Sequence, residues 1–413
     1  MRASPWSRLP GLAAILIPLT AQAQQPDWDS ADAETLRHLQ HLIQINTVNP
    51  PGNEMPVARY LDSVLTAEGI ETHRFEPAPG RASLVAQLKG RGEGPPVLLL
   101  GHMDVVPVEA GQWSVDPFAG VIQAGYLYGR GAIDDKGMLS VNLETMLLLK
   151  RHLVDRGLPL TRDVILVANS DEEAGGEWGM KWLIGHHPEL IRGAFALNEG
   201  GRIRVVGGKP LYVAVQSAEK VAHNLKVTAR GPAGHASVPL ADNAIVRLGR
   251  ALAAIGAHRE PVSIDPTVRR FFQQLGEVWP EPRQRRAMLA VASGNPSRQR
   301  RGAEVLAEVP VFSATLRNGI SPTLLGGGIR QNVIPAEAWV NLNVRTLPGQ
   351  SIGAVVTRLR RVVADSMVTI EVADSGAVEA PASSFDSPMF AAIAASAREL
   401  DSSLAVVPYL SPG

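Results

Sequence analysis

The chain has 413 residues, 45% of them hydrophobic, so it is long enough for two globular domains and is neither disordered nor fibrous. Its 40 basic and 40 acidic side chains cancel, which leaves no electrostatic footprint for a nucleic acid partner. Because the sequence contains no cysteine, disulfides and thiolate metal sites are excluded. Any metal must therefore be held by His, Asp and Glu side chains.

Residues 1–23 have the layout of a secretory signal peptide. Arg2 and Arg8 precede the apolar stretch LPGLAAILIPL, and AQA supplies small residues for cleavage near Ala23. The stretch is too short and too interrupted by proline to span a membrane comfortably, and a buried N-terminal helix is the alternative. We therefore expect a periplasmic or secreted protein that is free of the membrane once the signal is removed.

Helix and strand patterns alternate through residues 24–213. Amphipathic helices are predicted at 31–45, with Ser30 as the candidate cap, and at 57–68. Short apolar strands are predicted at 83–88, 96–101, 163–168 and 193–197, and a long helix at 138–155. This alternation predicts an α/β sheet covered by helices, in which binding residues collect where strands end.

The pattern changes from about residue 214. A strand at 223–231, a helix at 243–257, strand patterns around 338–344, a helix at 352–364 and a strand at 368–372 suggest a β-α-β-β-α-β domain inserted into the first. An arginine-rich run at 283–301 interrupts it. A patch that binds polyanions is one interpretation, but zero net charge favours a solvated helical insertion.

Two motifs place candidate ligands near strand ends. In GHMDVVP, His102 and Asp104 stand two residues apart, so both side chains point to one face, and a carboxylate beside an imidazole can orient it. A core histidine is the alternative. In GRGAIDDKG, Asp134 and Asp135 lie in a turn before a helix, where capping and the helix dipole also explain acidic residues.

Three consecutive carboxylates follow the predicted strand 163–168 in NSDEEAGGE. Repulsion between clustered acids makes their ionisation costly unless a cation or a proton lies among them. A solvated acidic loop is the alternative. His102, Asp134, Glu173 and Glu199 each stand at or just beyond a strand end and could converge on one sheet edge. Such donors suit zinc, and several carboxylates allow a bridged pair of ions.

The motifs GHMDVVP, GRGAIDDKG, SDEEAGG, ALNEGG and GPAGHASVP occur in an order and spacing that resemble the M20 family of zinc peptidases and amide hydrolases, over residues 30–413. The resemblance implies an α/β, zinc-peptidase-like catalytic domain with a mixed sheet and flanking helices at 24–213 and 375–413. It also implies a smaller α+β, ferredoxin-like lid at 214–374, through which the chain would form a homodimer.

The resemblance also implies roles for the candidate residues. His102 and Glu199 would bind one zinc ion, Glu173 would bind the other, and Asp134 would bridge the two. Asp104 would orient His102. Glu172 would be the general base.

His235, in the glycine-rich turn GPAGHASVP, would donate a hydrogen bond to the oxyanion. A surface histidine is the alternative for this residue, and His223 is expected to be structural. Arg345, Asn332 and Arg330 would grip a substrate carboxylate, which suits a guanidinium fork. A surface salt bridge is the alternative for Arg330. We expect a small peptide or an N-acyl amino acid as substrate.

The chain ends VVPYLSPG and has no histidine after His258. Members of the family continue with a TDS-type segment and a distal zinc-binding histidine, so we expect a truncated sequence whose second zinc site is incomplete. Such a form is expected to bind about one zinc ion tightly. The alternative is a non-catalytic relative that binds peptides or metal.

Overall fold

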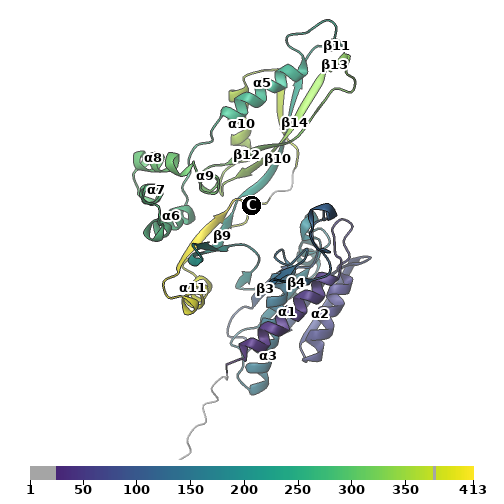
Figure 1. The fold of residues 1–413 in the computed structure, drawn as a ribbon, viewed down its shortest axis with the longest axis vertical. Helices are drawn as coiled ribbons and strands as arrows, with labels where there is room; N and C mark the ends of the chain where they lie inside the picture. The colour runs from purple at the N-terminus through teal and green to yellow at the C-terminus, as the bar shows by residue number, and fades with distance from the viewer. Residues whose placement is uncertain (1–24, 375–377) are drawn as a thin grey trace, which may run out of the picture. The chain divides into compact units, whose positions relative to one another are not determined.

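The computed structural model describes residues 25–374 and 378–413, and the chain divides into two compact units, Met1–Glu199 and Gly200–Gly413 (Figure 1). The predicted signal peptide lies outside the described residues. Within the described ranges, no helix combines the length and the apolar character that a membrane crossing requires.

The first unit is built on a five-stranded mixed sheet in the order β1-β2-β6-β3-β7. These strands span Glu71–Ala78 (β1), Arg81–Leu88 (β2), Val164–Asn169 (β6), Val97–His102 (β3) and Phe195–Leu197 (β7). Strands β6, β3 and β7 run parallel, whereas β1 and β2 pair in antiparallel fashion. The predicted α/β class with a mixed sheet is therefore confirmed.

Helices cover both faces of this sheet. Alternate residues of β2 and β6, such as Leu84 and Leu166, pack with α2 (Met55–Ala67) and α3 (Lys136–His152). Their neighbours, such as Val85 and Val167, face the other way and pack with Leu183 of α4 (Met180–His186). The side-chain period of two thus divides one apolar sheet between two cores.

The first helix, α1 (Trp28–Gln44), begins earlier than the sequence predicted. The Asp27 carboxylate accepts hydrogen bonds from the backbone N–H and the hydroxyl of Ser30 at 3.4 and 2.7 Å. The prediction that Ser30 caps this helix is therefore wrong: Ser30 lies in the first turn and Asp27 is the cap. An aspartate also suits this position because its charge opposes the helix dipole.

The connections of the first unit contain short elements. They are β4 (Val121–Gln123), β5 (Tyr126–Tyr128) and the 3-10 turns η1 (Ala110–Gln112), η2 (Val154–Arg156), η3 (Glu172–Ala174) and η4 (Pro188–Leu190). The turn η3 contains part of the acidic run, and only Ser170 and Asp171 lie between it and the end of β6.

The second unit contains an antiparallel four-stranded sheet in the order β12-β14-β10-β15. Its strands span Gly319–Gly327 (β12), Glu337–Thr346 (β14), Val221–Arg230 (β10) and Val368–Val372 (β15). Helices α5 (Ala244–Ala257) and α10 (Ile352–Val363) share a buried apolar cluster with it. Along the chain these elements follow the predicted β-α-β-β-α-β order.

A second cluster of this unit joins four helices to a smaller sheet. The helices are α6 (Pro266–Val278), α7 (Pro282–Ala292), α8 (Pro296–Leu306) and α9 (Pro310–Leu316), and the strands are β8 (Arg202–Val206), β9 (Lys209–Glu219) and β16 (Ala405–Ser411). Strand β16, which follows α11 (Pro388–Leu400), pairs in parallel with β9. The assignment of residues 375–413 to a catalytic domain stays a prediction.

The arginine-rich run forms helices α7 and α8, which bury small and apolar residues on one side. All six of its arginines are exposed: 283, 285, 286, 298, 300 and 301. The run is therefore a helical insertion with a solvated basic face, which is the interpretation that the zero net charge of the chain favoured.

Candidate metal centre

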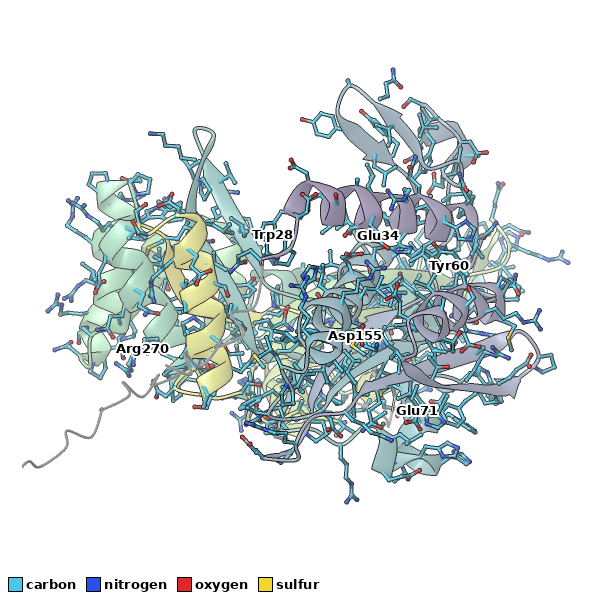
Figure 2. The ribbon with its side chains drawn as sticks, turned by 90° about the horizontal axis from the view of Figure 1, so that it is seen from below. Trp28, Glu34, Tyr60, Glu71, Asp155 and Arg270 are labelled. Carbon is cyan, nitrogen blue, oxygen red and sulfur yellow. The ribbon has the colours of Figure 1, made fainter. Side chains whose placement is uncertain are left out.

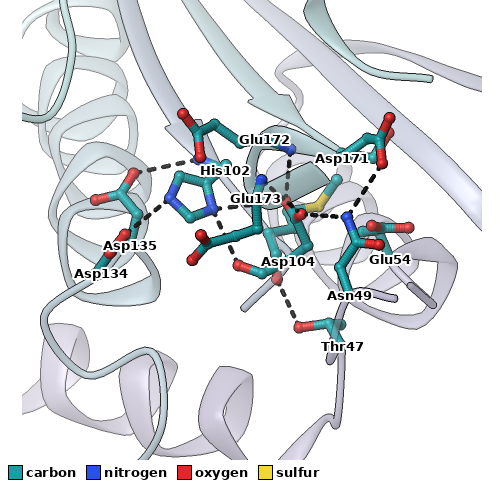
Figure 3. A network of polar contacts seen from close by, with 12 residues as sticks. Thr47, Asn49, Glu54, His102, Asp104, Asp134, Asp135, Asp171, Glu172 and Glu173 are labelled. Carbon is teal, nitrogen blue, oxygen red and sulfur yellow. Dashed lines mark hydrogen bonds and ion pairs between the residues drawn. The ribbon is translucent and has the colours of Figure 1, made fainter. Parts of the chain in front are cut away.

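His102 stands at the end of β3 with only 3% of its surface exposed (Figure 3). Its Nδ1 atom lies 3.0 Å from the backbone carbonyl oxygen of Asp104 and 3.5 Å from the carboxylate of the same residue. Its Nε2 atom lies 2.9 Å from Asp134 and 3.4 Å from Glu199. The ring is therefore held from one side and faces carboxylates on the other.

The parallel strands explain why residues distant in sequence meet here. His102 pairs with Asn169 at the end of β6, so the loop that carries Glu172 and Glu173 leaves the sheet beside it. Strand β7 runs parallel to β3 and ends at Leu197, two residues before Glu199. The motifs that contain His102, Glu173 and Glu199 thus lie at one edge of the sheet, because strands β3, β6 and β7 end there.

The turn before α3 approaches β3 closely at a glycine. A Cβ atom on Gly101 would lie 3.2 Å from a carboxylate oxygen of Asp135 and 3.4 Å from Leu139. Asp135 also accepts a hydrogen bond from the backbone N–H of His102 at 3.2 Å. The absence of a side chain at position 101 therefore lets the Asp134 and Asp135 turn sit against the strand.

Two sets of three donors could each hold a metal ion: His102 with Asp134 and Glu173, and His102 with Asp135 and Glu199. In each set the ligand atoms lie within 4.8 Å of one another. The structure thus brings together all four predicted ligands. It adds Asp135, which the sequence showed beside Asp134 without indicating which carboxylate faces the histidine.

One oxygen of the cluster lacks a partner. The Oε1 atom of Glu173 is buried and accepts no hydrogen bond from the described residues. A buried carboxylate oxygen without a donor is costly, and a cation is one way to satisfy it. The donor set, which has nitrogen and oxygen but no sulfur, fits zinc.

The cluster favours positive charge. Burial lowers the pKa of His102, but hydrogen bonds to Asp104 and Glu199 outweigh burial and raise this pKa to about 12. Burial raises the pKa of Asp135 to about 7, and burial is also the largest cause of the raised pKa values of Glu172 and Glu173. A field that holds a proton on an imidazole this strongly will also attract a metal cation.

Asp104 lies fully buried beneath the acidic loop. Its two oxygens accept hydrogen bonds from the backbone N–H groups of Glu172 and Glu173, both at 3.1 Å, and from the side-chain amide of Asn49 at 2.8 Å. Because Asp104 also contacts His102, a single carboxylate fixes the imidazole and the start of the acidic loop together.

A buried ion-pair network is connected to Asp104 through Asn49, which donates hydrogen bonds to both Asp104 and Asp171. Asp171, whose φ of 66° is left-handed, accepts hydrogen bonds from Asn49 at 3.1 Å, from Arg81 at 2.8 Å and from the backbone of Trp178 at 3.0 Å. Arg81 in turn forms two hydrogen bonds of 2.8 Å to Glu54. The first acid of the DEE run thus serves the scaffold, while the next two face the metal centre.

Three predicted residues of the second unit lie on one short arm. His235 of β11 (Gly234–His235) pairs with Val333 of β13 (Val333–Ile334). The backbone carbonyl of Asn332 accepts a hydrogen bond from Ala236 at 3.0 Å, and Arg330 precedes it in the same segment. The side chains of His235, Asn332 and Arg330 are exposed and therefore free to meet a ligand.

Arg345 is not brought to this arm within the chain. It lies near the end of β14, opposite Ala222 and Gly319, and its Nε atom donates to Asn343 at 3.1 Å. Eight residues separate it from Glu337 at the arm's end of the strand, or roughly 27 Å at 3.4 Å per residue. Its role in substrate binding stays a prediction.

His223 lies on β10, half-buried, with its Nε2 atom 3.2 Å from the hydroxyl of Thr346 on the neighbouring strand. This cross-strand contact agrees with the structural role predicted for it.

Comparison with known proteins gives a consistent family match. The profile of peptidase family M20/M25/M40 matches residues 98–413. A human N-fatty-acyl-amino acid synthase/hydrolase is 29% identical over 67% of this chain and 54% of its own length. A probable carboxypeptidase S-like protein of Dictyostelium discoideum is 31% identical over 75% of this chain and 59% of its own. The chain thus spans little more than half the length of these relatives.

A solved structure shows the same fold. The M20 family metallo-carboxypeptidase of Sulfolobus solfataricus aligns with a TM-score of 0.63 and 18% sequence identity, over 92% of this chain and 86% of that one.

Proposed function

The chain belongs to peptidase family M20/M25/M40, and from this membership we propose that it hydrolyses an amide or peptide bond in a small substrate that bears a free carboxylate. The observation that carries the proposal is the convergence of His102, Asp134, Glu173 and Glu199 at one sheet edge, with Glu172 beside them. Peptides and N-acyl amino acids are the substrates we favour.

We propose zinc as the cofactor, held by His102 together with Asp134, Asp135, Glu173 and Glu199. A bound zinc ion supplies Lewis acidity toward the scissile carbonyl and the attacking water. The unpartnered Glu173 oxygen and the sulfur-free donor set support this choice. Because both donor sets rely on the Nε2 atom of His102, they describe one ion, and a second ion would depend on the carboxylates alone.

Glu172 would act as the general base. Its backbone N–H is tied to Asp104, which fixes the position of the residue, while the residue stays partly open to solvent beside the cluster. Burial and the neighbouring carboxylates Glu199 and Asp104 raise the pKa of Glu172, although His102 opposes them. A raised pKa makes the carboxylate a stronger base, so Glu172 can take a proton from the attacking water and return it to the leaving nitrogen.

His102 is arranged so that a metal cation would replace the proton on its Nε2 atom and leave a neutral imidazole ligand. If its Nδ1–H donates to the backbone carbonyl of Asp104, the lone pair of Nε2 faces Asp134 and Glu199. Fixing the tautomer through the second ring nitrogen is the usual way to orient a metal-binding histidine.

The exposed arm carries residues for which we propose roles in substrate binding. The Nδ1 atom of His235 lies 2.7 Å from the hydroxyl of Ser237, which leaves Nε2 available to donate to a developing oxyanion. Arg330 and Asn332 on the arm are proposed contacts for the substrate carboxylate, and Arg345, at the other end of β14, is the alternative contact. The names of the two relatives, one acting on N-fatty-acyl amino acids and one carboxypeptidase-like, support a substrate with an amino acid carboxylate.

We also propose that the protein is exported and that it forms a homodimer through the domain at 214–374. The N-terminal layout of charge, apolar run and small residues supports export, and the exposed edge strand β12, with Leu324 and Leu325 more than 60% exposed, supports pairing. N-terminal sequencing of the protein from cell fractions and sedimentation equilibrium test these two statements.

The substitution Glu172→Gln tests the division of labour in the acidic loop. We expect the variant to retain zinc and to lose about 10²–10⁴-fold in turnover on N-acyl amino acids or dipeptides, because the general base is removed and no ligand is. Glu177→Gln, which changes an exposed acid of the same segment paired with Lys181, is the matched control and should leave both quantities unchanged.

Loss of zinc from Glu172→Gln would contradict the roles assigned to Glu172 and Glu173. A wild-type protein that binds zinc but hydrolyses none of a panel of dipeptides and N-acyl amino acids would favour a non-catalytic binding protein instead.

A further inference from the structure

A second group of metal-type ligands lies between α1 and α3, away from the sheet edge. Glu34 and His38 stand one turn apart on α1, and Glu144 faces them from α3. One ligand atom of each residue lies within 4.8 Å of the others. Figure 2 labels Glu34 on α1 and Tyr60 on the neighbouring α2.

The group is buried and its polar atoms are not satisfied. Glu144 is 4% exposed and His38 is 8% exposed. Both carboxylate oxygens of Glu144 and the Nε2 atom of His38 are buried, without a hydrogen bond from any described residue. Three such atoms side by side are costly, and native proteins normally satisfy them.

The histidine is oriented as a ligand would be. The Nδ1 atom of His38 lies 2.7 Å from the Tyr60 hydroxyl, and the two rings meet edge to face at 5.9 Å. If Nδ1–H donates to the tyrosine oxygen, Nε2 presents its lone pair toward Glu34, whose Oε1 atom is 3.7 Å away. That separation is close to the roughly 3.4 Å between two ligands of a tetrahedral ion with bonds of about 2.1 Å.

The surrounding charges leave room for a cation. Glu34 and Glu68 both accept hydrogen bonds from Arg151, whereas Glu144 receives none from it. The charged groups that act on Glu144 are the carboxylates of Glu34 and Glu68 and the guanidinium groups of Arg37 and Arg151. Three carboxylates against two guanidinium groups leave one net negative charge when His38 is neutral.

The protonation preferences of the group agree with this geometry. Burial is the main cause that lowers the pKa of His38, so the neutral imidazole needed for coordination is favoured. Burial raises the pKa of Glu144 to about 7, so a proton is the competitor that a cation must displace.

We propose that Glu34, His38 and Glu144 form a structural zinc site, distinct from the cluster around His102. Two carboxylates and one imidazole without a thiolate are a donor set for a divalent ion of the zinc type. Eight residues of α3 separate Glu144 from Lys136 at the start of the helix, or about 12 Å of helix axis. A bound ion would tie α1 to α3 and supply the partners that the buried atoms lack.

The proposal can be tested without interference from the centre at the sheet edge. His102 belongs to both donor sets of that centre, so His102→Ala weakens both. We load His102→Ala protein with zinc, remove unbound zinc by dialysis and measure the metal by inductively coupled plasma mass spectrometry. We expect it to retain about one zinc ion per chain. Adding Glu144→Gln should remove this ion, because Gln keeps the side-chain shape and loses the charge.

The matched control is Glu68→Gln in the same background. Glu68 contacts Arg151 as Glu34 does but offers no atom to the cluster, so its substitution should leave the retained zinc in place. Circular dichroism verifies folding, and His38→Gln replaces Glu144→Gln if the latter unfolds. The proposal is overturned if His102→Ala retains no zinc, or if the retained zinc survives the loss of Glu144 or His38.

Discussion

The buried pair of Arg81 and Glu54 allows a quantitative test of what holds the acidic loop in place. Glu54 has no exposed surface, and its two oxygens accept hydrogen bonds from Arg81 at 2.8 Å each. The substitution Arg81→Met keeps most of the apolar stem and removes the guanidinium group. Glu54 is then left as a buried carboxylate without its cation, which is the costly way to break such a pair.

The loss in the free energy of unfolding is limited because Glu54, once it lacks Arg81, can become neutral by binding a proton. Its ordinary pKa is 4.5, and burial raises this value, with Arg81 opposing the rise. At about 1.4 kcal/mol per pH unit, neutralising the group costs roughly 3.4 kcal/mol at pH 7 and roughly 0.7 kcal/mol at pH 5. These figures are upper limits for the charge contribution to the free energy of unfolding that the variant loses.

The sign of the pH dependence can be worked out in the same way. In Arg81→Met the folded state holds the proton of Glu54 more tightly than the unfolded state does. The folded state therefore binds more protons, and its stability falls as pH rises from 4.5 through the raised pKa. The charge contribution to the loss in Arg81→Met should thus be at most about 3.4 kcal/mol near pH 7 and at most about 0.7 kcal/mol near pH 5.

Hydrogen exchange of peptides from β2 and β6, followed by mass spectrometry, measures this loss in the first unit alone. Adding Glu54→Gln to Arg81→Met removes the stranded charge of Glu54 and should reduce the difference between the two pH values, since Asp171, the second partner of Arg81, keeps hydrogen bonds from Asn49 and Trp178. An equal loss at pH 5 and pH 7, or a pH difference that the second substitution leaves unchanged, would show that Arg81 does not act by compensating the charge of Glu54.

Three further outcomes are expected. His235→Ala should lower turnover by about 10²-fold at unchanged zinc content, the scale of one lost oxyanion donor, and a lower zinc content would argue against that role. Gly179→Ala places a Cβ atom 1.7 Å from the carbonyl oxygen of Ser170 and should reduce both stability and zinc retention, whereas Gly185→Ala, with open space around it, should not. Arg345→Lys should raise KM for carboxylate substrates by about tenfold and leave KM for amide-capped analogues unchanged.

Periodicity located most of the regular elements of the fold, and the errors have physical causes. The strand at 368–372 was predicted with the observed bounds, because its apolar alternation is regular. Strand β1 was missed because its sequence, ETHRFEPA, is polar and lies at the edge of the sheet, with the exposed side chains of an edge strand. Strand β12, GISPTLLGG, contains proline and three glycines, which indicate a loop but are tolerated at a sheet edge.

His102, Glu173 and Glu199 could be found from the sequence because they stand at or just beyond strand ends, where a parallel sheet gathers them, whereas Asp134 lies in the turn before α3. His102 follows its strand directly, and Glu199 follows β7 by two residues. The supporting residues Asn49, Arg81 and Glu54 belong to no acidic or histidine motif. Their partners are set by how the strands pack, so nothing local in the sequence indicates that they meet Asp171.

The contacts also separate two kinds of carboxylate in this centre. Asp104 and Asp171 each accept three hydrogen bonds from protein N–H donors, so their charges are already compensated within the fold. Asp134 and Glu199 share the single imidazole of His102, and a Glu173 oxygen has no donor among the described residues. A fold that supplies donors to one group of acids, and leaves the adjacent group short of positive charge, is built to take a cation from solution. The consecutive carboxylates of the DEE run therefore differ in role: Asp171 ties the loop to the scaffold, and we propose that Glu173 faces the cation and that Glu172 transfers the proton.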